Sequence, residues 1–376
     1  MRIGIITHNF PATSKERKDA GVFLQDFAIA LSKEHKVYIL SPHFTGDKEV
    51  YKNTPVTYFS WRGGKNKLGD FKITSPQSFI HFLSLITNGR KAAVSFAQEN
   101  KLDFILAAWA LPSGDFAYVA SKKTNVPYAV WTLGSDMNKF IKYPLLKGMI
   151  VRSLRSATLC FANSYSLIKK VEKITNKSCE FLPAVTNLQM PSGTRRKQKS
   201  FSFLFVGRLE KVKGPDVLLE AATKLPKNVN WKIKIGGDGT LQKELESYIT
   251  NNDLADHVEL LGRLDAHGVS AQMMQADCLV VPSRNESLPL VVIESSRAGL
   301  PVIVTDVGDC KHIVNKYVVG LVTKSEDPNL LAKSMMKAIK TKNFRRKYQK
   351  GLRNLSVDFT QDKVVSLFNS YVKNKI

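Results

Sequence analysis

Short apolar runs alternate with amphipathic stretches along the first half of the chain. Residues 3–6 form a β-branched run that ends at a polar turn, and apolar side chains then recur at helical spacing from Val22 to Leu31. Further apolar runs lie at 36–40, 104–107, 128–132 and 158–162. Buried strands that alternate with helices are typical of a parallel sheet covered on both faces. The first half therefore predicts a doubly wound α/β domain.

The alternation breaks and then restarts. Residues 182–199 contain Pro183, Pro191 and Gly193 and end in a basic cluster, which is typical of a linker. New apolar runs follow at 201–206, 231–235, 258–261, 278–281 and 301–304. The sequence predicts an N-terminal domain at 1–185, a linker at 186–200, a second domain at 201–357 and a C-terminal helix at 358–376. The predicted fold is α/β, with two Rossmann-like domains that face a cleft.

Composition agrees with a globular protein. The 376 residues are 43% apolar and 23% charged, and no apolar run is long enough to predict a transmembrane helix. The first residues show no apolar h-region followed by a cleavage site, so no signal peptide is expected. The four cysteines form no CxxC pair, which favours reduced thiols and a cytoplasmic location over a disulfide framework or a zinc site.

The charge is unusual. Lys and Arg number 56 against 32 Asp and Glu, a net charge of +24, and residues 1–190 (+13) and the remainder (+11) are both basic. Such a surplus indicates an anionic partner: nucleic acid, an acidic membrane surface or a phosphorylated small molecule. No RNA- or DNA-binding motif is visible, so nucleic acid is not expected.

The densest basic stretch is 139–177, with nine cations and one acid, Glu172. Within it, residues 140–152 interleave basic and apolar side chains. Two interpretations remain open for this segment. It can lie on an anionic membrane surface, which would make the protein peripheral, or it can be an ordinary helix with solvated lysines.

The turns after the strands of the second domain carry candidate phosphate ligands. Gly207 and Arg208 follow the first strand, and Lys213 comes five residues later, before Gly214. Glycine permits a sharp turn, and both cations suit phosphate oxygens. The next turn, 236–239, is glycine-rich without a Walker A pattern, and it is equally consistent with close packing and with ligand contact.

The strongest segment is 282–294, which follows the strand at 278–281. Ser287 to Leu290 precede a helix, whose free N–H groups can hold a phosphate. Glu286 and Glu294 are separated by seven residues. Helix capping is the alternative role for Glu286, and a solvated helix face is the alternative for Glu294. Because Glu294 follows the apolar run Leu290–Ile293, a binding role, such as accepting ribose hydrogen bonds, is favoured.

Glu286–Glu294 resembles the E-x7-E motif of retaining GT-B glycosyltransferases, specifically glycosyltransferase family 4 (group 1). Other stretches are similar to motifs of that family in the same order. They are 109–114 (Trp-Ala-Leu-Pro-Ser-Gly), 133–136 (Leu-Gly-Ser-Asp), 206–209 with Lys213–Gly214, 236–239, 261–263 and 306–308.

The resemblance implies the GT-B fold, in which the C-terminal helix can return to the N-terminal domain. It also implies transfer, with retention of anomeric configuration, from a nucleotide-diphosphate sugar to a hydroxyl acceptor, such as a lipid-linked or surface-polysaccharide precursor. No cofactor and no metal are expected, since two cations can stabilise the departing diphosphate.

The resemblance also assigns roles to residues. The catalytic candidates are Arg208, Lys213 and Glu286. The donor-binding candidates are Gly21, which would let the first domain's backbone approach the diphosphate, Gly207, Arg263, Ser287, Leu288 and Glu294. Trp109 and Asp136 are expected in the acceptor or sugar pocket.

One position departs from the family pattern. Leu133 stands before Gly134-Ser135-Asp136, where the family commonly has a histidine that contacts the donor sugar. Either Asp136 and the neighbouring backbone suffice, or the sugar pocket is altered, or the chain is a donor-binding pseudoenzyme. A Rossmann dehydrogenase is disfavoured because no GxGxxG follows the first strand.

Overall fold

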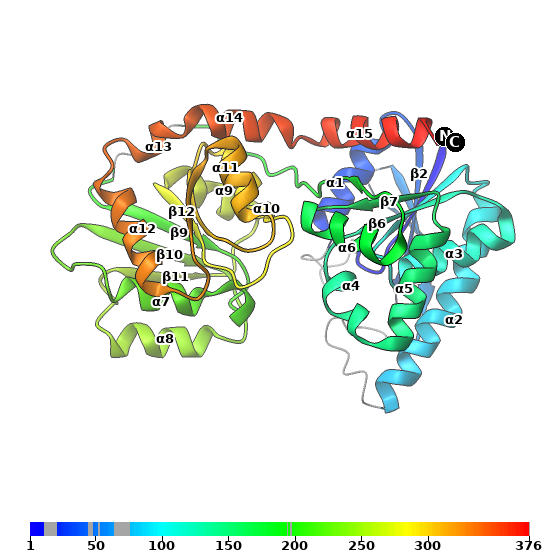
Figure 1. The fold of residues 1–376 in the computed structure, drawn as a ribbon, viewed down its shortest axis with the longest axis horizontal. Helices are drawn as coiled ribbons and strands as arrows, with labels where there is room; N and C mark the ends of the chain where they lie inside the picture. Colours follow the sequence, from blue (N-terminus) through cyan, green and yellow to red (C-terminus); the bar gives the residue numbers. More distant parts are fainter. Residues whose placement is uncertain are drawn as a thin grey trace. The chain divides into compact units, whose positions relative to one another are not determined.

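The computed structural model describes residues 1–10, 21–43, 48–51, 53–63, 76–193, 195 and 198–375. The chain forms two compact units, Met1–Thr186 with Gln361–Ile376, and Asn187–Thr360 (Figure 1). Asp19 and Ala20, which precede Gly21, and Thr194, Arg196 and Lys197 of the predicted linker lie outside the described residues.

The first unit is built on an eight-stranded sheet with the order β3-β4-β2-β1-β5-β6-β7-β8. Its strands are β1 (Arg2–Ile6), β2 (Lys36–His43), β3 (Lys48–Tyr51), β4 (Thr54–Ser60), β5 (Phe104–Ala108), β6 (Tyr128–Thr132), β7 (Leu159–Ala162) and β8 (Glu180–Phe181). Among the strand pairs of the described residues in this unit, only β3–β4 is antiparallel. The strand order reverses between β1 and β5, and this point of reversal is the topological switch point of the sheet. In open α/β sheets, ligands bind at the carboxyl ends of the two strands that flank the switch point.

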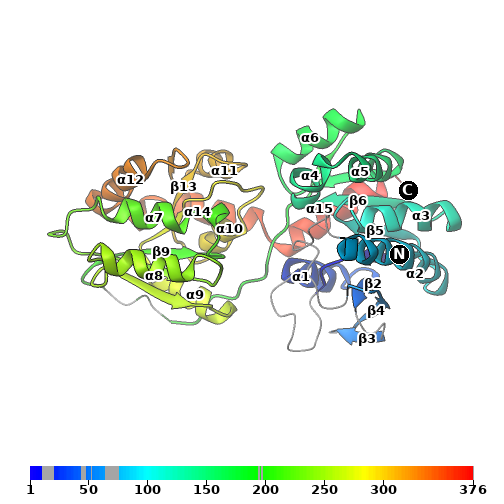
Figure 2. The same cartoon turned by 90° about the horizontal axis from the view of Figure 1, so that it is seen from below.

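Helices cover both faces of this sheet. The helices are α1 (Val22–Leu31), α2 (Pro76–Glu99), α3 (Ser113–Thr124), α4 (Ser135–Asn138), α5 (Pro144–Ser156), α6 (Tyr165–Thr175) and α15 (Gln361–Lys373), with a 3-10 turn at Phe140–Lys142. Figure 2 shows α2, α3, α5 and α6 following one another across one face. Their buried side chains, among them Phe96, Phe116, Leu154 and Val171, form one apolar core with the strands.

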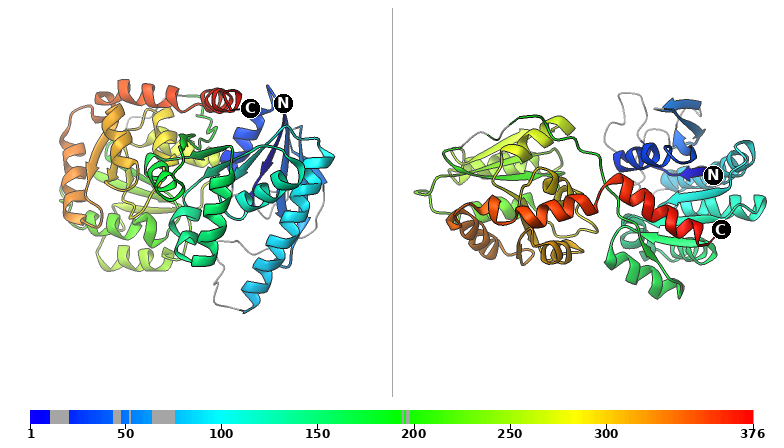
Figure 3. Two further views of the ribbon diagram at one scale, coloured as in Figure 1. Left: turned by 45° about the vertical axis from the view of Figure 1, so that its right-hand side comes forward. Right: turned by 90° about the horizontal axis from the view of Figure 1, so that it is seen from above.

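The C-terminal helix α15 packs against α1 on the other face (Figure 3). Its Phe368 is fully buried among the rings of Phe27, Phe104 and Phe161, with centroid distances of 5.7, 6.2 and 5.8 Å. Asn369 adds side-chain hydrogen bonds to Glu34 and His35. The chain therefore completes its first unit with its last helix, as the resemblance allowed. This helix begins at Gln361, because residues up to Asp358 belong to α14 of the second unit.

The second unit has a six-stranded, fully parallel sheet with the order β11-β10-β9-β12-β13-β14. Its strands are β9 (Phe201–Val206), β10 (Trp231–Gly236), β11 (Val258–Gly262), β12 (Cys278–Val281), β13 (Val302–Thr305) and β14 (Gly320–Thr323). Its helices are α7 (Pro215–Ala222), α8 (Gln242–Asn251), α9 (Ala266–Gln275), α10 (Leu290–Arg297), α11 (Cys310–Tyr317), α12 (Pro328–Lys340), α13 (Phe344–Lys347) and α14 (Gln349–Asp358), with a 3-10 turn at Lys211–Lys213. The two Rossmann-like sheets confirm the predicted fold class.

Local chemistry fixes several helix ends. Ser164 and Asp265 cap α6 and α9, and their side chains accept hydrogen bonds from the backbone N–H groups of Leu167 (3.2 Å) and Gly268 (2.7 Å).

All four cysteines are buried and unpaired. Among the described residues, no helix combines the length and hydrophobicity that crossing a bilayer would require.

Phe368→Ala should destabilise the first unit by about 3–5 kcal/mol, because it empties the space between three buried rings. Urea unfolding followed by tryptophan fluorescence measures the loss. The exposed Ser366→Ala on the same helix is the control and should change the unfolding free energy by no more than about 0.5 kcal/mol. Equal effects of the two substitutions would show that α15 is not part of the core.

Candidate functional site

The predicted donor residues gather at the switch point of the second sheet. The strand order reverses between β9 and β12, so the turns after these two strands meet at one edge. Gly207, Arg208 and Lys213 follow β9, while Glu286 follows β12. The sequence placed these residues at strand ends, and the topology brings the two strand ends together.

An ion pair joins the two turns. Lys213 Nζ lies 2.7 Å from Glu286 Oε1, and only 27% and 9% of the two side chains are exposed. Ser283 Oγ donates a second hydrogen bond of 2.7 Å to the same carboxylate oxygen. An ammonium group has three N–H donors, so Lys213 can hold Glu286 and still offer two donors to another anion. Two of the three predicted catalytic residues are thus in direct contact.

Ser283 was not among the predicted site residues. It is fully buried, and its carbonyl oxygen accepts the Thr305 hydroxyl at 2.6 Å, which ties the loop to the end of β13. Its spacing to Glu286 is the S-x-x-E pattern of a capping box, a local signal that was available in the sequence. Ser283 therefore positions Glu286 rather than capping a helix.

A second ion pair braces the same loop. Arg284 makes a bidentate contact with Asp216 at the start of α7, with both distances 2.9 Å, and it also reaches Glu326 at 3.0 Å. Burial alone would raise the pKa of Asp216, but the Arg284 hydrogen bonds and charge, together with Lys211, lower it below its usual value. The backbone N–H of Arg284 bonds the Val212 carbonyl at 2.9 Å. The loop after β12 is thus locked to the segment that carries Lys213.

Two glycines allow this close approach. Gly214 has φ +70°, and a Cβ there would lie 2.1 Å from the Pro282 carbonyl oxygen. Gly308, after β13, has φ +53°, and its Cβ would lie 2.0 Å from the carbonyl oxygen of Glu286. Any larger residue at either position would push the Glu286 loop away.

The start of α10 offers further polar groups. Ser287 and Leu288 lie between Glu286 and the helix, and no acceptor among the described residues binds their backbone N–H groups. Glu294 lies within α10, one to two turns after its first residue, and is half-buried. A strand end, two free amides and a helix N-terminus form an arrangement that suits a phosphate.

The remaining donor candidates lie at neighbouring strand ends. Arg208 and Arg263 are exposed, and Arg263 Nη1 is 4.0 Å from the Asp238 carboxylate. The Gly207 N–H bonds the Gly236 carbonyl at 3.0 Å, which holds the β9 and β10 turns together. The 236–239 turn therefore packs closely against the β9 turn, one of its two predicted roles.

In the first unit, Gly21 is the N-cap residue directly before α1 and has φ +78°, so the positive φ that favours glycine is present there. Trp109 follows β5 with φ +71°, and its ring lies 4.4 Å from that of His8, which follows β1. These two side chains meet at the switch point of the first sheet. His8 was not among the predicted site residues, because a histidine at a strand end is more often structural.

The Asp136 side chain binds backbone N–H groups of its own loop and of the loop after β5. Its carboxylate accepts backbone N–H groups of Ala110 (2.8 Å), Gly134 (3.1 Å) and Met137 (3.0 Å) and is fully buried. Burial raises its pKa, while these hydrogen bonds act in the opposite direction. In the structure it joins the loops after β5 and β6, and its predicted contact with a sugar stays a prediction. Leu133 precedes this loop and is half-buried.

Several cations of the basic stretch 139–177 have structural partners. Arg152 and Arg90 both bind the fully buried Asp115, at 2.7 Å each. Lys170 donates to the Asn138 side chain, and Lys177 to the Ala157 carbonyl. Lys142 and Lys147, at the start of the stretch, are exposed.

Comparison with known proteins identifies the class. The family described as "Glycosyl transferases group 1" matches residues 189–354. The GalNAc-α-(1→4)-GalNAc-α-(1→3)-diNAcBac-PP-undecaprenol α-1,4-N-acetyl-D-galactosaminyltransferase of Campylobacter jejuni is 30% identical over 370 residues, 96% of this chain and 94% of that protein.

Solved structures share the fold. Sucrose-phosphate synthase of Thermosynechococcus elongatus superposes with a TM-score of 0.80 at 16% identity, covering 99% of this chain and 98% of that one. HepE of Anabaena, solved in complex with UDP-glucose, gives 0.74 at 18% identity and covers 100% of both chains. The architecture is that of GT-B glycosyltransferases. The chain is a glycosyltransferase and belongs to the group 1 family.

Gly308→Ala should weaken donor binding and lower stability, because its Cβ would collide with the Glu286 backbone. Gly262→Ala is a matched control: φ is +65° there and no atom lies within 4 Å of the added carbon. Both substitutions carry about 1–2 kcal/mol of left-handed strain. Only Gly308→Ala should unfold at clearly lower urea concentration than the control; identical curves would contradict the steric claim.

Asp216→Asn should remove about 1.5–3 kcal/mol of stability at pH 7, the usual contribution of a hydrogen-bonded charged group. Because the folded pKa of Asp216 is lowered, its stabilisation is present above the unfolded value of about 3.9 and is lost as the pH falls below it. The wild type should therefore lose stability more steeply than the variant as the pH falls from about 5 to about 3. Parallel pH profiles from thermal melts would contradict this.

Proposed function

We propose that the protein transfers a sugar from a nucleotide-diphosphate donor to a hydroxyl acceptor with retention of anomeric configuration. The observation that carries this proposal is the Lys213–Glu286 ion pair at the switch point of the second sheet, beside the free amides of Ser287 and Leu288. The Campylobacter relative, whose name states a sugar transfer, supports the same reaction class.

The donor diphosphate would bind at the β9 and β12 turns. Ser287 and Leu288 would donate their N–H groups to the distal phosphate, and Lys213 would add the two donors that Glu286 leaves free. Arg208, whose side chain is exposed, would bind the diphosphate from the solvent side of the turn. As the bond to the sugar breaks, negative charge grows on the diphosphate, so these cations would stabilise the transition state more than the bound donor.

The two carboxylates would act on different parts of the donor. Glu286 would accept a hydrogen bond from a sugar hydroxyl, because Ser283 and Lys213 fix its carboxylate at the strand end. Glu294 would accept hydrogen bonds from the ribose, and Arg263 would lie on the side of the base. Two cations at the diphosphate would perform the electrostatic role of a divalent metal, so transfer is proposed to be metal-independent.

The acceptor is proposed to be lipid-linked or a precursor of a surface polysaccharide. The Campylobacter relative's name specifies an undecaprenol-linked acceptor. This chain is strongly basic, at +24, which favours association with an anionic membrane surface from the cytoplasmic side. Trp109, at the switch point of the first sheet, would take part in the acceptor or sugar pocket.

Turnover tests the proposal. The purified protein should slowly hydrolyse one member of a panel of nucleotide sugars, and proton NMR of a transferred product should show the anomeric configuration of the donor. An inverted product would contradict retention. Saturable nucleotide-diphosphate binding without hydrolysis or transfer would favour the alternative, a donor-binding pseudoenzyme, which Leu133 at the usual histidine position makes worth testing.

Glu294→Ala should weaken binding of the preferred donor at least about tenfold, since a hydrogen bond to a charged group contributes roughly 1.5–3 kcal/mol. Calorimetric titration measures the change. Glu246→Ala, which removes an exposed carboxylate from α8 in the same unit, is the control for net charge and should leave affinity unchanged. Equal affinities for both variants would remove Glu294 from the donor site.

A further inference from the structure

The net charge of the second unit comes from one segment. Residues 187–360 hold 27 Lys and Arg against 18 Asp and Glu, and residues 328–357 hold nine of these cations and no acid. The rest of the unit is balanced, with 18 residues of each sign. Because 139–177 is longer, has the same nine cations and contains an acid, the prediction that it is the densest basic stretch is wrong.

This basic segment forms α12, α13 and α14, which follow one another along one side of the second unit (Figure 1). Arg345 is its structural member: the guanidinium donates to backbone carbonyl oxygens at the ends of α9 and α10, and burial lowers its pKa to about 10. Lys333, Lys337 and Lys340 of α12 are exposed instead, and no carboxylate among the described residues pairs with them. These three lysines are available to an external anion.

A groove lies between α7 and α12, which pack against each other (Figure 2). Its volume is about 400 Å³, and its charged lining is the three α12 lysines with Lys224, two residues after the end of α7. Ala332, which is buried, and Met336, which is half-buried, supply an apolar lining. Among the described residues that line the groove, none is acidic or aromatic.

The acids of the two helices and of their caps already have partners. Glu220 on α7 lies 3.9 Å from the ammonium group of Lys224, and Asp216 is held by Arg284. Asp327 caps α12 by accepting a hydrogen bond from a backbone N–H of its first turn at 3.0 Å. Three residues of this unit lie outside the described ones, and none is acidic: Thr194, Arg196 and Lys197.

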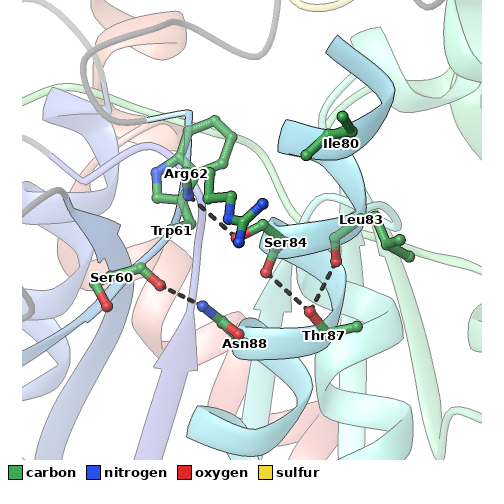
Figure 4. Close-up of a pocket in the computed structure, with 8 residues that line it drawn as sticks. All are labelled: Ser60, Trp61, Arg62, Ile80, Leu83, Ser84, Thr87 and Asn88. Atoms are coloured by element: carbon green, nitrogen blue, oxygen red, sulfur yellow. Dashed lines mark hydrogen bonds between the residues drawn. The ribbon is translucent and has the colours of Figure 1, made fainter. Parts of the chain in front are cut away.

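The first unit has a groove with a different charge pattern, between β4 and α2 (Figure 4). Its walls bond each other, since the Arg62 backbone N–H donates to Ser84 Oγ at 3.1 Å and Asn88 Nδ2 donates to the Ser60 carbonyl at 3.0 Å. Arg62 is the one cation among its described lining residues. A row of cations is a feature of the α7–α12 groove.

The α12 lysines repeat at helical spacing. They are four and three residues apart, which is roughly 6 and 4.5 Å along the helix axis. Glutamates with the same spacing on a second helix would meet them, because every α-helix has this repeat. Ala332 and Met336 would contact an apolar stripe on that helix, as in the helix-in-groove mode of recognition. An acidic, amphipathic helix therefore matches the groove in charge, spacing and polarity.

Other anions match it less well. Single-stranded nucleic acids bind by stacking on aromatic side chains, and the described lining has none. Bidentate phosphate recognition uses arginine forks, whereas the cations here are all lysines. A second copy of this chain carries a net charge of +24 and would be repelled.

The groove is separate from the donor site. Helix α7 begins directly after the turn that carries Lys213, and its eight residues span roughly 12 Å before Lys224 is reached. Helix α12 likewise begins after the carboxyl end of β14 and ends at Lys340. A partner bound beside Lys224 and Lys340 would leave the Lys213–Glu286 pair uncovered.

We propose that the α7–α12 groove docks an acidic, amphipathic helix of a partner protein. Lys333, Lys337 and Lys340 pair with carboxylates on that helix, and Ala332 and Met336 contact its apolar stripe. The contact brings the glycosyltransferase to its partner without using a residue of the donor site. The proposal therefore does not depend on the proposed function.

A labelled synthetic helix tests the groove. Fluorescence anisotropy compares a peptide whose glutamates flank a leucine stripe with a peptide of the same composition in rearranged order, both with excess nucleoside diphosphate to occupy the donor site. The protein should bind the patterned peptide at least about fivefold more tightly, and added salt should weaken this binding. Equal affinities for the two peptides would overturn the proposal and leave only a general attraction between opposite charges.

Matched charge reversals locate the site. Lys337→Glu should weaken binding of the patterned peptide about fivefold, because the reversal turns an exposed attraction into a repulsion. Lys243→Glu, at an exposed position of α8, makes the same change in net charge outside the groove and should bind like the wild type. Thermal melts check that both variants stay folded. Identical affinities for the two variants would overturn the proposal.

A single-stranded oligonucleotide of the same charge is the competing ligand. The protein should bind it more weakly than the patterned peptide. Binding of the oligonucleotide that is equally tight and equally sensitive to Lys337→Glu would overturn the proposal, because it would make the groove a nucleic-acid site.

Donor hydrolysis separates this proposal from the proposed function. Lys337→Glu should hydrolyse the nucleotide sugar at the wild-type rate, because Lys337 lies outside the donor site. Loss of peptide binding with intact hydrolysis supports the groove assignment. If the wild type binds the peptide through Lys337 but hydrolyses no donor, the proposed function fails while the docking groove remains.

Discussion

The second unit depends on one short ion pair between two strand ends. Lys213 and Glu286 are distant in sequence, and their 2.7 Å contact requires the turns after β9 and β12 to approach closely. A largely buried charge pair is stable only when hydrogen bonds satisfy the remaining polar atoms. Ser283 supplies one of these bonds, and Arg284 anchors the same loop to Asp216. Glycines at 214 and 308 remove the side chains that would keep the backbones apart.

Under the proposed function, this arrangement would place cationic donors where the leaving diphosphate develops charge. Helix α10 and the free amides before it add partial positive charge at the same edge, with no need for rearrangement of the loop. The first unit is organised by the same rule, since Trp109 and His8 meet at its own switch point. Both sheets therefore present their chemistry at the carboxyl ends of the central strands.

Much of this could be predicted from the sequence, because buried parallel strands are apolar runs and glycine-rich turns follow them. Strands β3, β4, β8 and β14 were not predicted. Strand β4 mixes polar and apolar residues, β8 has two residues, and β14 is short and begins with glycine. The Arg284–Asp216 pair joins residues 68 positions apart and has no local signal. The orientation of Asp136 toward its own loop, like the pairing of Arg152 with Asp115, depends on tertiary packing that a linear pattern does not encode.

Binding of nucleoside diphosphates to two lysine variants tests the central claim most directly. Lys213 and Lys211 lie on the same 3-10 turn, but Lys211 is exposed and pairs with Asp216 and Glu244 instead of Glu286. Lys213→Met should bind the preferred nucleoside diphosphate at least about tenfold more weakly than the wild type. Lys211→Met should bind it with nearly unchanged affinity. Equal affinities for the two variants would contradict the assignment of the Lys213–Glu286 pair to the diphosphate site.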